Sequence, residues 1–164
     1  MTAQTEVQTD GGGNEKGVKR RLKPHELAVW RMFLRAHSRI TRRIEADLIA
    51  EHALPLASFD VLLTLMEAPN RRLRMTELAD HVLLSRSGMT RLVDRLEREG
   101  LVVREACAND ARGMFTVLTE AGHQRLRRAS RTHLRGVDEY AVSRLSPDEL
   151  EAFGKTLAKL LDED

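Results

Sequence analysis

Hydroxyl and guanidinium side chains, which contact phosphates and base edges in protein–DNA complexes, are concentrated in residues 85–98. If this segment is an α-helix, with about 100° between successive residues, one face carries polar and cationic groups and no large apolar one. The opposite half carries Met89, Leu92, Val93 and Leu96. Because the major groove of DNA admits one α-helix, this pattern predicts a recognition helix. The DNA contacts expected on it are Ser85, Arg86, Ser87, Thr90, Arg91, Arg95 and Arg98.

The order of the neighbouring elements favours DNA contact over a merely solvated face, which an arginine-rich surface alone would equally indicate. Thr76 is a good N-cap for a short helix that ends near Leu83, and Leu84-Ser85 turns the chain into the longer helix. Gly100 is suited to the residue just beyond that helix. A short helix, a tight turn and a longer helix form the helix-turn-helix arrangement.

A two-stranded hairpin is expected directly after the longer helix. Residues 101–118 read as strand, turn and strand, with turn chemistry in residues 108–113. Arg112 at the tip would enter an adjacent minor groove, with Asp110 orienting its guanidinium. A turn with an idle arginine is the alternative. Arg104, on the first strand, joins the expected DNA contacts.

Amphipathic helices flank this winged unit. After Pro24, apolar residues recur at steps of three and four as far as about His52, which predicts a long helix of a kind that often packs against another chain. Ser58 is expected to cap the next helix, Thr119 opens a later one, and Ser146 begins a capping box for the last. The stripe of the first helix contains Leu27, Trp30, Leu34, His37, Ile40, Ile44 and Leu48, and that of the last contains Leu150, Phe153, Leu157, Leu160 and Leu161.

Composition bounds the class of protein. Of 164 residues, 41% are hydrophobic, 32% charged and only 4% aromatic, which favours a single, mainly α domain. No apolar run is long enough for a membrane span and no secretory signal is visible, and with one cysteine, Cys107, the protein is expected to be cytoplasmic. The six histidines form no tight metal motif, and no catalytic motif occurs, so neither an enzyme nor a cofactor is expected.

An ordered set of short motifs resembles the MarR family of transcriptional regulators. The resemblance covers roughly residues 25–161 and lies in Phe59–Leu65, Met75–Ala79, Ser87–Leu96, Gly100–Arg104, Asp110–Gly113 and Leu118–Gly122. It implies a mainly α fold with a small β-hairpin wing, in which a winged helix-turn-helix lobe is joined to a helical dimerisation body. Residues 1–23 are expected to be a disordered basic tail, because they contain almost no large apolar side chain and end in a basic cluster. The resemblance implies a MarR-like domain over residues 24–164, with 24–53 and 119–164 for dimerisation and 58–118 for binding DNA.

The same resemblance implies a homodimer that binds a pseudo-palindromic double-stranded operator, commonly as a repressor released by a small aromatic or phenolic effector. Candidate effector residues are Trp30, His37, Asp60 and Arg91. Two alternatives stay open: a winged-helix module that contacts protein, and a regulator that senses oxidants through Cys107. The polar face of residues 85–98 argues against the first, because protein interfaces are usually anchored by aromatic or aliphatic side chains.

Overall fold

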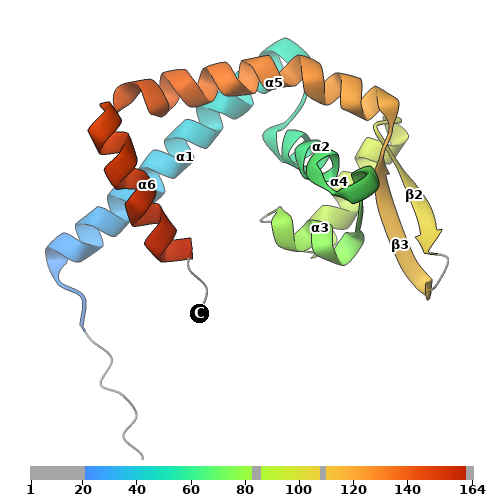
Figure 1. Cartoon of the computed structure of the whole chain (residues 1–164), viewed down its shortest axis with the longest axis horizontal. Helices are drawn as coiled ribbons and strands as arrows, with labels where there is room; N and C mark the ends of the chain where they lie inside the picture. The colour runs from blue at the N-terminus through green and yellow to red at the C-terminus, as the bar shows by residue number, and fades with distance from the viewer. Residues whose placement is uncertain (1–20, 83–85, 108–109, 162–164) are drawn as a thin grey trace, which may run out of the picture. The chain divides into compact units, whose positions relative to one another are not determined.

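The computed structural model describes residues 21–82, 86–107 and 110–161, with the backbone alone at Arg86, Cys107 and residues 110–113 (Figure 1). The chain divides into two compact units, Met1–Leu34 and Arg35–Asp164. The elements are α1 (Pro24–His52), α2 (Leu56–Glu67), η1 (Pro69–Arg71), β1 (Arg72–Arg74), α3 (Met75–His81), α4 (Arg86–Arg98), β2 (Val102–Cys107), β3 (Asp110–Leu118), α5 (Glu120–Tyr140), η2 (Val142–Arg144) and α6 (Pro147–Leu161).

The described part of the first unit is dominated by the opening turns of α1. The helix begins at Pro24, as predicted, and the Glu26 carboxylate accepts a hydrogen bond from the Lys23 amide at 2.7 Å. Trp30 stacks on Phe33 with 5.7 Å between ring centroids, and 54% of Trp30 remains exposed. The predicted apolar stripe is therefore present here without forming a buried core.

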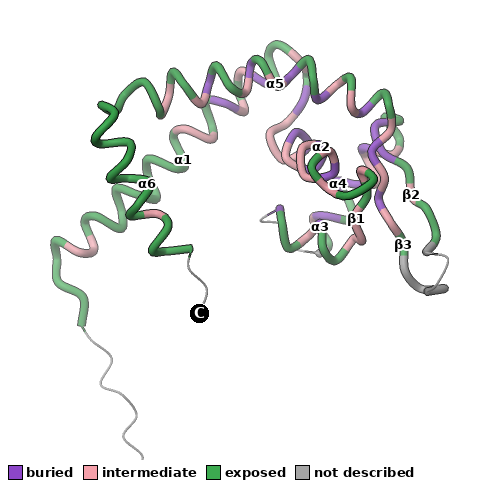
Figure 2. Tube along the Cα trace, in the orientation of Figure 1, coloured by how far each residue is buried: buried purple, intermediate pink, exposed green. Residues whose placement is uncertain are grey.

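The second unit contains a core that most of its elements share (Figure 2). The second half of α1 contributes Ile44 and Leu48, while α5 contributes Leu126 and Ala129. Most of the core comes from the segment between them, and its fully buried side chains include Phe59, Val61, Leu62, Leu65, Leu78, Met89, Val93, Leu96 and Val102.

The predicted hairpin is present as β2 and β3, and β1 adds a third antiparallel strand, which was not predicted, in the order β1-β3-β2. Arg74 pairs with Phe115 at one edge and Arg104 with Thr116 at the other. Cys107 of β2 pairs with Asp110 of β3, so strand β3 begins inside the segment 108–113 that was predicted to be a turn. Arg112 accordingly belongs to strand β3.

Two of the expected helix caps are wrong. Helix α2 begins at Leu56, with Pro55 as its N-cap residue, and Ser58 lies buried in the first turn. Proline restricts φ to a value compatible with helix initiation, so no serine is needed there. Helix α3 begins at Met75, one residue before the expected cap Thr76, and the Glu77 carboxylate accepts a hydrogen bond from the Arg74 amide at 2.8 Å.

The caps predicted from local motifs further along the chain are present. The Thr119 hydroxyl oxygen accepts a hydrogen bond from the Gly122 amide at 3.0 Å and donates one to the Gly100 carbonyl at 2.7 Å. Gly100 itself has a φ of 72°, as expected for a residue that follows a helix. At α6, the Ser146 amide donates to Glu149 at 2.9 Å, while the Glu149 amide donates to the Ser146 hydroxyl at 3.3 Å.

Gly122 allows α5 to start against the base of the wing. A Cβ atom at this position would lie 2.1 Å from the Leu101 carbonyl oxygen, far inside contact distance. The same carbonyl accepts the Thr119 amide at 3.1 Å. Backbone contacts thus hold the start of helix α5 against Leu101, the residue directly before β2.

Helix α6 is amphipathic in sequence, yet none of its described residues is buried. Phe153 is 45% exposed and Leu160 is 69% exposed. Among the described residues no single helix is long and apolar enough to cross a membrane; α1 and α2 meet a length and composition criterion only as a pair, bent by 86°.

Candidate nucleic-acid interface

Helix α4 has the two faces that its sequence predicts. Its inward side chains are Met89, Val93 and Leu96, all fully buried, and Leu92, which is 7% exposed. Ser87, Thr90, Arg91 and Arg98 are exposed on the outer side. The helix therefore packs on the core through aliphatic groups and presents hydroxyl and guanidinium groups to solvent, which are the groups that contact nucleic acid.

The three arginines of this face differ in their contacts. Arg91 is exposed and, within the described residues, forms no ion pair. Arg98 is exposed, and its Nε donates to the Asp94 carbonyl at 3.3 Å. Arg95 is half-buried, donates to the Ser58 hydroxyl at 2.7 Å and lies 3.9 Å from Glu99. Arg91 is the guanidinium most available to a ligand, whereas Arg95 also ties α4 to α2.

Arg104 connects the wing to the recognition helix. Its guanidinium lies 2.5 Å from Asp94 Oδ1 and 2.5 Å from Glu97 Oε2, and its amide donates to Glu97 at 3.2 Å. The hydrogen bond to Asp94 raises the pKa of Arg104 above its ordinary value. The DNA contact expected of Arg104 stays a prediction, and the structure adds an internal role that sequence reasoning missed: it holds β2 against α4.

For five of the residues singled out from the sequence, the structure describes only the backbone or does not describe the residue. Ser85 is not described, and of Arg86 only the backbone, at the start of α4, is given. The backbones of Asp110 and Arg112 lie in β3, and that of Cys107 ends β2. Their predicted roles in DNA contact and in oxidant sensing stay predictions.

Two cations at the sheet edge, Arg72 and Arg74, are not among the residues singled out from the sequence. Arg72 and Arg74 both lie over the Phe115 ring, with their guanidinium carbons 4.8 and 5.8 Å from its centroid. The signal was present as a run of arginines at 71, 72 and 74, directly before the helix-turn-helix. The significance of this run depends on the pairing of β1 with β3, because that pairing brings Phe115 beneath the arginines.

The four expected effector residues are not gathered at one described hollow. Trp30 belongs to the first unit, and His37 is an exposed residue of the second. Asp60 lines a cavity of about 300 Å³ with Leu63, Thr64, Glu67, His81 and Val82, and neither His37 nor Arg91 lines it. Burial, with a smaller contribution from Glu45, raises the pKa of the Asp60 carboxyl above its ordinary value.

His133 on α5 packs against Phe59 on α2. Its ring stacks on Phe59, with 4.4 Å between centroids and 19° between planes, and within the described residues no hydrogen bond to it is seen. Burial lowers the pKa of His133, so the neutral ring is favoured. In the described ranges, no three His, Cys, Asp or Glu side chains are grouped so as to hold a metal ion.

A short helix α3, a longer helix α4 with a polar outer face and a small antiparallel wing define a winged helix-turn-helix protein of the DNA-binding class. Residues 53–113 match the sequence profile of the MarR family. The chain is 30% identical over 136 residues to the HTH-type transcriptional regulator YkoM of Bacillus subtilis, covering 83% of this chain and 82% of YkoM. The chain belongs to the MarR family of transcriptional regulators.

Two further proteins place it within that family. Transcriptional repressor MprA of Escherichia coli is 32% identical over 107 residues, which cover 64% of this chain and 61% of MprA. The MarR family regulator Sco3205 of Streptomyces coelicolor, whose structure was determined in complex with DNA, has a TM-score of 0.81 and 34% identity, covering 88% of this chain and 91% of Sco3205. The predicted fold class and family are confirmed, and the relatives are regulators, not enzymes.

Proposed function

We propose that this protein is a homodimeric transcriptional repressor that inserts α4 of each subunit into the major groove of a pseudo-palindromic operator. The observation that carries the proposal is the outer face of α4, where Ser87, Thr90, Arg91 and Arg98 are exposed over a fully apolar inner face. That face offers both hydroxyl and bidentate guanidinium groups to phosphates and base edges. The DNA complex of Sco3205, a relative of 34% identity, supports the assignment.

Exposed apolar side chains support the homodimer. Phe153 and Leu160 on α6 are exposed, and in the other unit Trp30 is exposed on α1. Such side chains in one chain favour a second copy that covers them. Two-fold symmetry then requires the two α4 helices to lie about one DNA turn apart, roughly 34 Å, on the operator.

Repression and release by an effector are the finer parts of the proposal. MprA, which is 32% identical over part of its length, is a repressor by name. For the effector, a small aromatic or phenolic compound, the feature of this chain that supports a site is the cavity lined in part by Asp60. Burial raises the pKa of the Asp60 carboxyl above its ordinary value.

The test of DNA recognition is Arg91→Ala. The protected DNA is first located by footprinting on the region upstream of its own gene, and the affinity for that fragment is measured by fluorescence anisotropy at several salt concentrations. We expect Arg91→Ala to weaken binding by about tenfold and to reduce the slope of log affinity against log salt by about one, because one cation contact is lost.

Arg39→Ala is the matched control, because Arg39 is an exposed arginine on α1 outside the proposed interface. It should leave both the affinity and the salt slope unchanged. Equal behaviour of Arg91→Ala and the unaltered protein would remove the outer face of α4 from the interface.

A further inference from the structure

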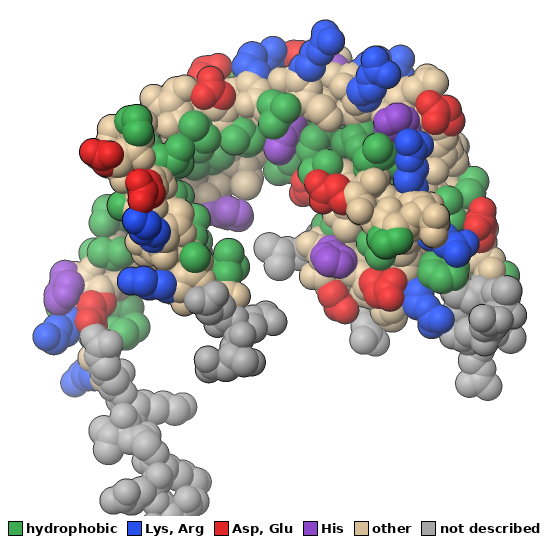
Figure 3. Space-filling model, in the orientation of Figure 1, with side chains coloured by type: hydrophobic (Ala, Val, Ile, Leu, Met, Phe, Trp, Pro, Cys, Tyr) green, Lys and Arg blue, Asp and Glu red, His purple; other side chains and the backbone are tan. Residues whose placement is uncertain are grey.

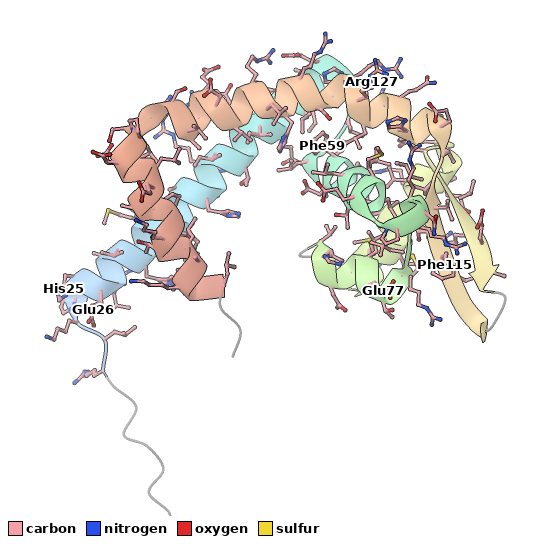
Figure 4. All side chains as sticks on the ribbon, viewed as in Figure 1. His25, Glu26, Phe59, Glu77, Phe115 and Arg127 are labelled. Carbon is pink, nitrogen blue, oxygen red and sulfur yellow. The ribbon has the colours of Figure 1, made fainter. Side chains whose placement is uncertain are left out.

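A second cationic surface lies on α5, away from the residues of the proposed DNA interface. Arg127, Arg128 and Arg131, here called the α5 arginine cluster, line a hollow of about 500 Å³ together with His52 and Gln124. Figure 3 shows Lys and Arg side chains gathered over α5 along the top of the view, and in Figure 4 Arg127 lies on the opposite side of α5 from Phe59. The cluster therefore faces solvent and not the core.

Acidic residues that are close in sequence to the lining residues His52 and Gln124, or that line the neighbouring hollow, pair with other cations. Glu51 pairs with Arg135. Glu120 lies 3.7 Å from Arg71, and Glu99 lies 3.9 Å from Arg95. Within the described residues, no carboxylate forms an ion pair with any member of the α5 arginine cluster. Three like charges within five residues of one helix repel each other, and a bound anion would relieve that repulsion.

Hydrogen bonds between α1 and α5 hold the wall of the hollow in place. The Thr132 hydroxyl donates to Glu51 at 2.7 Å, so its oxygen accepts from His52 Nε2 at 2.8 Å. Arg125 donates to the His52 carbonyl. Because the backbone and ring at the end of α1 are already fixed, little ordering is needed there when a ligand binds.

A second hollow continues the first along α5. It has a volume of about 440 Å³ and shares Gln124 and Arg128 with the first, and small or apolar residues, among them Ala53, Leu101 and Ala121, form part of its lining. The first hollow is thus lined by three arginines, and the second by Arg125, Arg128 and one carboxylate, Glu99.

We propose that the hollow at the α5 arginine cluster is a binding site for a short chain of phosphate groups. Arginine forks match phosphate oxygens in bidentate geometry, and three of them offset most of the charge of a di- or triphosphate. Arg127 to Arg131 spans about 6 Å of helix axis, which suits two or three linked phosphates better than the longer row of phosphates along a duplex. The site is separate from α4 and does not depend on the proposed operator recognition.

Isothermal titration calorimetry of the full chain with inorganic tripolyphosphate tests the proposal. We expect one saturable site per chain, and we expect the combined variant Arg127→Gln, Arg128→Gln, Arg131→Gln to bind at least about tenfold more weakly. The matched control is Arg35→Gln, Arg39→Gln, Arg42→Gln, which removes the same charge from exposed residues of α1 and should change the affinity less than about twofold. Unchanged thermal midpoints show that both variants are folded.

A nucleoside triphosphate forms the second arm. Tighter binding than tripolyphosphate would show that the second hollow accepts a nucleoside, and equal binding would assign the site to the phosphate chain alone; either supports the proposal. Absence of saturable binding, or equal weakening in the two triple variants, overturns it. If tripolyphosphate does not bind while the cluster variant alone lowers the salt slope of DNA binding, the cluster is a nucleic-acid contact and the proposal is wrong.

Discussion

The winged lobe, from α2 to β3, and the last helix, α6, carry similar amphipathic patterns and reach opposite outcomes in one chain. In the lobe, Phe59, Leu62 and Leu78 are fully buried, whereas on α6 the side chains of Phe153 and Leu160 stay exposed. The difference shows that an apolar stripe predicts that a helix face will be covered without indicating what covers it. The stripes of the lobe are covered by its own elements together with α1 and α5, and α6 has no such partner among the described residues.

The two regions should therefore respond differently to protein concentration. Stability that arises within one chain is independent of concentration, whereas stability that arises from association increases with it. Variants in the two regions can be separated on this basis.

The largest effect is expected for Phe153→Asp. A charge on the apolar face of α6 would prevent association, because a buried unpaired carboxylate is strongly unfavourable. Sedimentation should show the 18.6 kDa subunit in place of a dimer of twice that mass. Operator affinity should fall on the order of 100-fold, because the two recognition helices are no longer linked.

The control for this variant is Lys155→Ser, on the polar side of α6, where Lys155 pairs only with Glu151 at 2.5 Å in the described structure. It should remain dimeric with full affinity. A dimeric Phe153→Asp protein would show that the α6 face is not the association surface.

A smaller effect, confined to the lobe, is expected for Gly122→Ala. Its Cβ would lie 2.1 Å from the Leu101 carbonyl oxygen, and a backbone atom there cannot move without shifting the wing. We expect the free energy of unfolding to fall by about 2–3 kcal/mol, independent of protein concentration, in urea titrations.

Gly136→Ala is the same substitution in the same helix. The nearest neighbour of its Cβ would be a side-chain atom, Cγ1 of Ile44, at 3.0 Å, which has to shift by only a few tenths of an ångström. Its cost should stay within about 1 kcal/mol, since alanine also favours the helix. An equal decrease in the free energy of unfolding of the two variants would show that the contact between Gly122 and the Leu101 carbonyl does not hold α5 against the wing.

The smallest effect concerns pH. The pKa of His133 is lowered in the folded chain by burial, so between that value and the ordinary 6.5 the unfolded chain binds more protons. Stability is therefore complete above pH 6.5 and decreases as the pH falls through the folded-state pKa. His133→Phe, which keeps a ring against Phe59, should lose less stability on acidification.

The measurement is the thermal midpoint at pH 7.5 and at pH 5.0. His133→Phe should reduce the acid-induced decrease by about 2 °C relative to the unaltered protein. His25→Phe, at an exposed position on α1, is the control and should retain the full decrease. No difference between the two variants would show that His133 does not contribute to the pH dependence.

Features encoded by nearby residues could be predicted from the sequence. The buried set on α4, the Thr119 cap and the capping box at Ser146 each depend on spacings of a few residues, and all are present. Pro24 likewise marks the start of α1 correctly. In these cases the local geometry of a helix decides which groups meet.

Features that depend on contacts between distant segments could not. β1 has only three residues, and nothing in them indicates that β3 will accept them as a partner. The DNA contact predicted for Arg95 stays a prediction, and its hydrogen bond to Ser58, 37 residues away in the sequence, could not be foreseen. Arg104 appears as a free cation because Asp94 and Glu97 become its neighbours only when β2 turns back along α4.

Helix α5 is a single uninterrupted helix of 21 residues, about 32 Å long. Its first turn is clasped to the wing base at Leu101, and its final residue, Tyr140, donates a hydrogen bond to Asp47 on α1 at 2.7 Å. Because α5 is one uninterrupted helix held at both ends, a rotation at one end applies a torque to the other end. A rotation of α1 at Asp47 must therefore either turn the base of the wing or break the contact of α5 with Asp47 or with Leu101.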